Sequence, residues 1–141
     1  MDIDDLKAHL EWAEGRRNFP YEDSVGKLTI GIGRNLDDVG LSDDEVDMCL
    51  QNDIERVLGA VQNLSFWDGL DPVRQLVVAD MVFNLGFTRF LGFIKTISAL
   101  EAGDYQTAAD EMKDSRWYRQ TGRRAQKLVQ VMRTGEWIEN A

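Results

Sequence analysis

The segment VRQLVVADMVFNLG, residues 73–86, most constrains the fold, because it is apolar on nearly every side. A helix that is hydrophobic all round belongs in the middle of a helical bundle. Asp71 and Pro72 supply a start signal, since proline is tolerated at the first helical position, and Gly86 supplies a stop. The segment therefore predicts a central helix against which other helices must pack.

Several other segments also have helical signatures. Residues 3–14 repeat apolar side chains with a helical period and end before Gly15. Ser42 and Glu45 have the spacing of a capping box, which predicts a helix from that point to about residue 62. Shorter helices are expected over three later segments, residues 90–102, 105–114 and 123–133.

Residues 16–36 have a different pattern, in which apolar side chains alternate with polar residues or glycine. This pattern predicts a small antiparallel β-ribbon, which must pack on helices because fewer than about three strands are not stable alone. We therefore predict an α+β protein with a β-ribbon lobe over about residues 15–36. Residues 1–14 and 42–141 are expected to form a mainly helical lobe of the same single domain, residues 1–141.

Charge and composition argue against several classes of protein. The formal net charge of −9 disfavours binding to nucleic acid or to an anionic membrane surface. One histidine and one cysteine provide neither a His-rich metal site nor an intramolecular disulfide. No apolar run approaches the roughly 18 residues of a membrane span, and the first residues lack a signal-peptide pattern. We expect no metal, no cofactor, no nucleic acid, no stable membrane association, and accumulation in a cytoplasm.

Three polar residues frame the predicted ribbon: Glu14 at the end of the first helix, Asp23 in a turn and Thr29 on a strand. Glycoside cleavage needs a proton donor for the leaving oxygen and a carboxylate that acts on the sugar carbon or its attacking water. Glu14, in a partly buried position, is the candidate donor, Asp23 the candidate carboxylate, and the Thr29 hydroxyl could position the water. Spacing alone carries little weight, because the chain has 25 Asp and Glu residues.

The order of short motifs along the whole chain is more specific than the spacing of two carboxylates. The motifs are Glu14-Gly15, Tyr21-x-Asp23, Thr29-Ile30-Gly31-Ile32-Gly33, Asp71-x-Val73-Arg74, Met81-Val82-Phe83-Asn84-Leu85-Gly86, Ser115-Arg116-Trp117-Tyr118, Gln120-Thr121, Arg124-Ala125 and Arg133-Thr134-Gly135-x-Trp137. In this order they resemble the phage T4-type lysozymes, a glycoside hydrolase family of bacteriophage endolysins.

The resemblance implies a lysozyme-like fold with the active-site cleft between the two lobes. It also implies hydrolysis, with inversion, of the β-1,4 bond between N-acetylmuramic acid and N-acetylglucosamine in bacterial peptidoglycan, leading to lysis of the host cell. Glu14 takes the place of the general acid, Asp23 that of the second carboxylate, and Thr29 that of the hydroxyl that helps to hold the water. The resemblance further implies a monomer that is released by a holin and acts in the periplasm and cell wall once the membrane is permeabilised.

Three residues outside the ribbon match substrate or acid contacts of the family. Phe83 matches an aromatic residue that lines the sugar cleft, Thr96 a small hydroxyl residue, and Arg124 an arginine that pairs with the acid. Pattern alone instead favours a core position for Phe83 and a solvated helix charge for Arg124, and both alternatives stay open here. Trp117 is expected to pack at a helix junction.

The chain also departs from the family pattern. Arg34 stands where the family has a histidine paired with an aspartate, here matched by Asp53, and an Arg34–Asp53 pair is geometrically plausible. Only residues 35–42 connect the ribbon to the next helix, which predicts a smaller β lobe. Two alternative functions remain: a lytic transglycosylase of the same fold, which would need no water-activating pair, and an inactive wall-binding or phage structural module.

Overall fold

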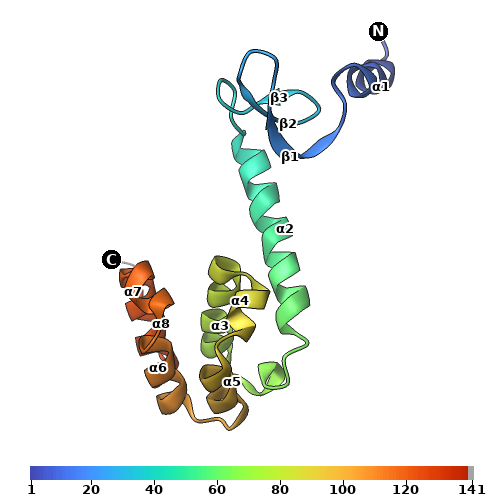
Figure 1. Ribbon diagram of the computed structural model, residues 1–141. Helices are drawn as coiled ribbons and strands as arrows, with labels where there is room; N and C mark the ends of the chain where they lie inside the picture. Colours follow the sequence, from blue (N-terminus) through green and yellow to red (C-terminus); the bar gives the residue numbers. More distant parts are fainter. Residues whose placement is uncertain (140–141) are drawn as a thin grey trace. The chain divides into compact units, whose positions relative to one another are not determined.

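The computed structural model describes residues 1–139 and divides the chain into two compact units, Met1–Cys49 and Leu50 onward (Figure 1). The first unit holds α1 (Ile3–Glu14), β1 (Arg17–Glu22), β2 (Leu28–Gly31), β3 (Arg34–Asn35) and the beginning of α2 (Asp43–Val61). The second holds the rest of α2, a short 3-10 helix (Trp67–Gly69), α3 (Pro72–Leu85), α4 (Phe87–Leu91), α5 (Ile94–Glu101), α6 (Tyr105–Lys113), α7 (Arg116–Thr121) and α8 (Arg123–Thr134). The α+β class is confirmed, whereas the single domain stays a prediction.

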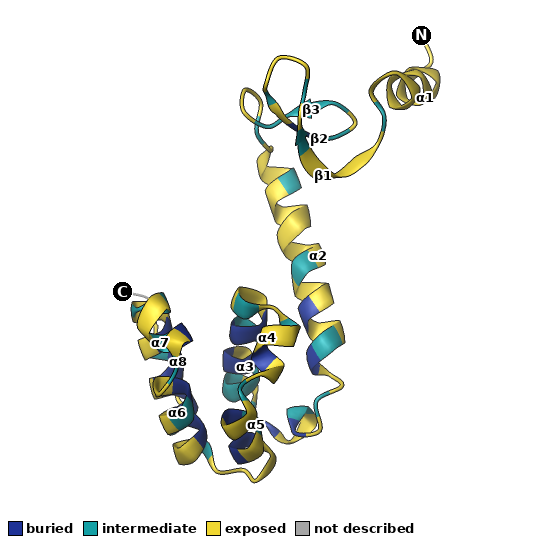
Figure 2. Ribbon diagram, in the orientation of Figure 1, coloured by how far each residue is buried: buried dark blue, intermediate teal, exposed yellow. Residues whose placement is uncertain are grey.

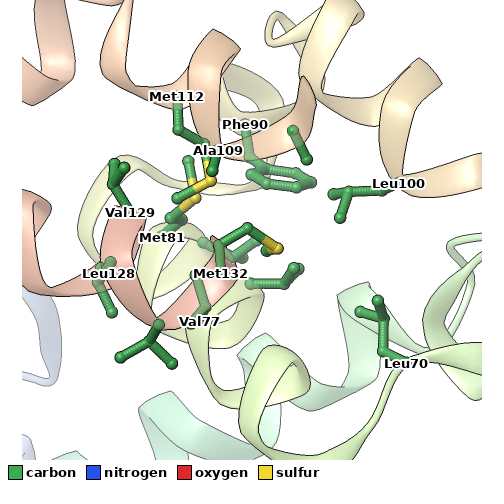
Figure 3. Packing of buried hydrophobic residues seen from close by; sticks show 14 of the residues in the cluster. Leu70, Val77, Met81, Phe90, Leu100, Ala109, Met112, Leu128, Val129 and Met132 are labelled. Atoms are coloured by element: carbon green, nitrogen blue, oxygen red, sulfur yellow. The ribbon is translucent and has the colours of Figure 1, made fainter. Parts of the chain in front are cut away.

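The hydrophobic core lies in the second unit and confirms a central role for α3. Val77, Val78, Met81 and Val82 of this helix are all buried. Residues from α5, α6 and α8 complete the same cluster, and Figure 3 shows several of them gathered near Phe90 of α4. In the first unit, by contrast, α1 buries no residue (Figure 2). In residues 1–139 no helix combines the length and apolar character needed to cross a membrane.

Local sequence signals position the helix ends as expected. The Asp71 side chain accepts a hydrogen bond from the Arg74 N–H at 3.2 Å, Pro72 opens α3, and Gly86 ends it with a φ of 86°. At the start of α2, Glu45 accepts from the Ser42 N–H at 3.0 Å. The Glu45 N–H in turn donates to the Ser42 hydroxyl oxygen at 3.3 Å, which completes the predicted capping box.

Two helices differ from the sequence prediction. The helix expected over residues 90–102 is broken into α4 and α5, because the Gly92 N–H closes α4 by donating to the Arg89 carbonyl at 3.0 Å. The other, α7, was not expected. Ser115 caps its beginning, with the hydroxyl oxygen accepting from the Tyr118 N–H at 3.1 Å, and Gly122 follows its 6 residues as the C-terminal cap.

The ribbon is a three-stranded antiparallel sheet in the order β1-β2-β3. Arg17 pairs with Gly31 and Tyr21 with Thr29, so residues 18–20 form a bulge opposite a single residue of β2. Pro20 lies in this bulge of an edge strand, a position at which proline is tolerated in sheets. The central strand, β2, therefore carries Thr29 between two neighbours.

Arg34 is paired with a carboxylate other than Asp53. Arg34 Nη1 instead lies 2.7 Å from Glu45 Oε1 and also donates to the Gly40 carbonyl at 3.1 Å. The capping box explains the choice, since it already turns the Glu45 carboxylate back toward the loop before α2. Asp53 pairs with Arg56, one turn along the same helix, at 2.8 Å.

Acid should weaken the ion pair between Arg34 and Glu45. Hydrogen bonds from the Arg34 guanidinium, and then from the Ser42 N–H and hydroxyl, lower the pKa of Glu45 from 4.5 to about 2. A carboxyl group whose pKa is lower in the folded state stabilises that state. The stabilisation is complete when the pH is above the unfolded pKa of 4.5, and it is lost as the pH falls through the folded pKa of about 2. We therefore expect Glu45→Gln to lower Tm at neutral pH and to lose part of the wild-type decline in Tm between these two pH values.

Thermal unfolding of both proteins across this pH range measures the effect. The difference in Tm between the wild type and Glu45→Gln is the relevant quantity, because other carboxylates titrate in the same pH range. Both side chains are about a third or more exposed, so salt should shrink the difference. If the Tm of the two proteins changes with pH in parallel, the ion pair between Arg34 and Glu45 does not contribute to stability in the way proposed.

Candidate active site

Glu14 is the last residue of α1, and the helix ends because Gly15 adopts a φ of 78° while its N–H donates to the Glu11 carbonyl. The Glu14 side chain is exposed, so the partial burial expected for it is not found. Its end lies against the β2–β3 turn. A methyl group on the Cα of Gly33 would come within 2.8 Å of Glu14 Oε2 and 2.9 Å of Cδ. The end of α1 thus brings this carboxyl group to the ribbon.

Asp23 is held in the turn between β1 and β2. Its Oδ1 accepts hydrogen bonds from the backbone N–H groups of Val25, at 2.9 Å, and Lys27, at 2.8 Å. Its own N–H donates to the Lys27 carbonyl at 2.9 Å. Gly26, with a φ of 83°, allows the chain to turn here. Because both side-chain bonds use Oδ1, the carboxylate is oriented while Oδ2 is left for another donor.

Thr29 is buried on the central strand, with only 4% of its surface exposed. Its hydroxyl donates to the Lys27 carbonyl at 2.9 Å, so its oxygen can still accept a hydrogen bond from another group. The backbone of Lys27 therefore connects two candidate residues: its N–H holds Asp23 and its carbonyl holds Thr29. Sequence reasoning missed Lys27, because its contribution comes from the peptide backbone and not from the side chain.

The three ribbon residues all lie in the first unit, and each is fixed by a different local element. Glu14 projects from a helix end, Asp23 from a turn and Thr29 from a strand. A carboxyl group, an oriented carboxylate and a hydroxyl are the groups that acid-assisted attack by water on a glycosidic bond requires. In residues 1–139 no cluster of His, Cys, Asp or Glu is suited to hold a metal ion.

In the second unit, Phe83 is 45% exposed, so the core position favoured by its sequence pattern is wrong. It lines two hollows of about 250 and 260 Å³. Thr96 on α5 is 2% exposed and lines a larger hollow of about 940 Å³. Trp117 borders the same hollow, and its Nε1 donates to Asn84 Oδ1 at 2.9 Å, which confirms packing at a helix junction.

Arg124 on α8 has a carboxylate partner within the second unit. Its Nε and Nη2 lie 2.9 and 2.8 Å from Asp80 Oδ1 on α3. Asp80 was missed, although it is the only acidic residue in the apolar segment of residues 73–86 and could have been noticed for that reason. The pairing of Arg124 with the acid at Glu14 stays a prediction.

Comparisons with known proteins cover nearly the whole chain. A family model described as Phage lysozyme matches residues 11–135. Two relatives from Dictyostelium discoideum, described as Probable T4-type lysozyme 2 and Probable T4-type lysozyme 1, are 27% and 24% identical to the chain, each over 94% of this chain and 96% of the relative. The Pre-baseplate central spike protein Gp5 of Enterobacteria phage T4 is 32% identical over 69 residues, which are 49% of this chain and 12% of that protein.

Proposed function

The chain belongs to the phage lysozyme family, and from this premise we propose that it hydrolyses the β-1,4 bond between N-acetylmuramic acid and N-acetylglucosamine. Family membership makes it a lysozyme-type glycosidase that acts on the peptidoglycan of the cell wall. The observation that carries the proposal is the grouping of Glu14, Asp23 and Thr29 around one small ribbon, with the Glu14 carboxyl against Gly33 and the other two on Lys27.

In the proposed reaction, Glu14 donates a proton to the oxygen that leaves with N-acetylglucosamine. A water held by Asp23 and the Thr29 hydroxyl attacks the anomeric carbon of N-acetylmuramic acid from the opposite face, and Asp23 takes up the proton of that water. The C–O bond to the leaving sugar breaks as the bond to water forms, so the anomeric configuration is inverted. Such a water requires the two carboxyl groups to stand about 6.5–9.5 Å apart.

Residues of the second unit have supporting roles in this proposal. The exposed ring of Phe83 offers an apolar face to a sugar ring, and Thr96 offers a hydroxyl at the edge of a hollow. We propose Arg124 as the partner of the acid Glu14. The proposal is supported by the number of N–H donors on a guanidinium, which is larger than the number that Asp80 uses.

We further propose that the enzyme lyses the host cell at the end of a phage infection. It would accumulate as a monomer in the host cytoplasm and reach the periplasm and wall after a holin has permeabilised the membrane. Support comes from its family, whose model is one of phage lysozymes.

Mass spectrometry of the fragments released from purified peptidoglycan tests the proposed reaction. We expect fragments that end in a reducing N-acetylmuramic acid. Fragments lighter by one water, with an anhydro sugar end, would identify a lytic transglycosylase instead. Fragments ending in reducing N-acetylglucosamine would place the cut at the other bond, and the absence of any released fragment would favour a wall-binding or structural module.

A further inference from the structure

Gly33 differs from the other glycines of the ribbon in what surrounds it. Its φ is +69°, and the place that a side chain would take is occupied by Glu14, with Oε2 at 2.8 Å, Cδ at 2.9 Å and Cγ at 3.0 Å from where a methyl carbon would stand. Gly26 and Gly31 also have positive φ values, of +83° and +70°, yet nothing lies within 4 Å of the corresponding positions. Backbone conformation explains a glycine at all three sites, but only at Gly33 does the missing side chain also make room for a candidate catalytic group.

We propose that Gly33 is a positioning residue, whose missing side chain provides the space in which the Glu14 carboxyl group stands. The inference rests on the proposed function for its catalytic consequence, though not for the contact itself. Among the described residues of the first unit, the Glu14 side chain has no hydrogen-bond or ion-pair partner, so polar contacts within this unit do not fix its end. Its close approach to Gly33 is therefore the contact within this unit that limits where the proton donor can lie.

The physics of this contact predicts which property a substitution should change. The atoms nearest Gly33 belong to the free end of a flexible side chain, so an added methyl group should push the Glu14 carboxyl aside and leave the ribbon folded. A displacement of about 1 Å at a reacting group can cost about 100-fold in rate. The loss should fall on kcat, with KM nearly unchanged, because a displaced proton donor weakens the transition state more than the bound substrate.

Gly31→Ala is the matched control for Gly33→Ala. Both glycines flank the same β2–β3 turn and have nearly equal φ values, of +70° and +69°, so alanine brings a similar backbone penalty at each. They differ in that only the methyl group at position 33 meets Glu14. We expect both variants to lower Tm by similar amounts, while kcat on soluble glycan fragments falls about 100-fold for Gly33→Ala and only a few-fold for Gly31→Ala.

A second measurement does not depend on activity. In the NMR spectrum of the wild-type protein, a nuclear Overhauser effect between the Glu14 γ-protons and the Gly33 α-protons is expected, and Gly33→Ala should weaken it. Equal kcat values for the two alanine variants, or the absence of this signal from the wild-type protein, would overturn the inference. A wild type that shows the signal but releases nothing from peptidoglycan would contradict the proposed function and would equally remove the catalytic role of Gly33.

Discussion

For the Glu14→Gln variant we expect kcat on purified peptidoglycan to be about 1,000-fold lower than for the wild type. This loss lies within the rate factor of about 10²–10⁴ that general acid catalysis contributes. Glutamine has nearly the shape of glutamate but cannot donate a proton to the leaving sugar oxygen. The variant should remain folded, because the Glu14 side chain is exposed and α1 buries no residue. We expect its Tm to lie close to that of the wild type, since exposed substitutions of this kind change stability by about 0.5 kcal/mol or less.

Glu11→Gln provides the control on the same helix. Glu11 is exposed, lies one turn before Glu14 and forms a long 3.5 Å ion pair with Arg16, which contributes little to stability. Its variant should clear cell-wall material at nearly the wild-type rate, as measured by the fall in turbidity at equal concentrations of folded protein. If Glu14→Gln clears the wall as well as Glu11→Gln does, Glu14 is not the acid.

The Arg74→Met variant is expected to lose about 3 kcal/mol of the free energy of unfolding, at about 1.5 kcal/mol for each of the two hydrogen bonds that the charged guanidinium donates to carbonyl groups. The Arg74 side chain is only 14% exposed and joins three helices. Its guanidinium lies 3.0 Å from Asp71 at the start of α3 and donates to the carbonyls of Met132, at 2.7 Å, and Arg133, at 3.3 Å. It also stands 4.0 Å from the centre of the Tyr105 ring on α6.

These contacts explain why the loss should be large. The last carbonyl groups of a helix have no hydrogen-bond partner within the helix. At the end of α8, Arg74 donates a hydrogen bond to two of these carbonyl groups. Methionine keeps the apolar stem but removes the guanidinium, so the Met132 carbonyl loses its side-chain donor and Asp71 loses its ion pair. The Arg133 carbonyl keeps the Gln106 donor at 2.9 Å, and Asp71 keeps the backbone N–H of residue 74. For a chain of this length the expected change in stability corresponds to about 10 °C in Tm.

Thermal and urea unfolding measure the effect, and Arg123→Met is the matched control. Arg123 is exposed at the start of α8, so its replacement should change the free energy of unfolding by about 0.5 kcal/mol or less. Well below its Tm, Arg74→Met should retain wild-type activity per folded molecule. Equal stabilities for the two methionine variants would show that the Arg74 contacts do not hold the helices together.

Local sequence signals were sufficient for most helix ends. Asp71 and Pro72 start α3, Ser42 and Glu45 form the capping box, and Gly86 ends a helix, because each signal acts within about one turn of the chain. The break between α4 and α5 was missed, since an isolated glycine such as Gly92 is tolerated within many helices.

Contacts between distant residues were harder to predict. The resemblance suggested Asp53 as the partner of Arg34, but the geometry of the capping box selected Glu45. Asp80 as a partner of Arg124, and Gly33 against Glu14, depend on how separate elements pack, which spacing in one sequence does not reveal. The roles given to Glu14, Asp23 and Thr29 came from the ordered family motifs, and they remain predictions that only experiments on the reaction can test.

The anomeric configuration of the newly formed N-acetylmuramic acid end, followed by NMR as soluble glycan fragments are cleaved, tests the central claim most directly. If Glu14 and Asp23 act from opposite sides of the bond with a water between them, the α-anomer appears first and the β-anomer grows in only by mutarotation. Initial release of the β-anomer would indicate a retaining reaction and would contradict the roles proposed for Asp23 and Thr29.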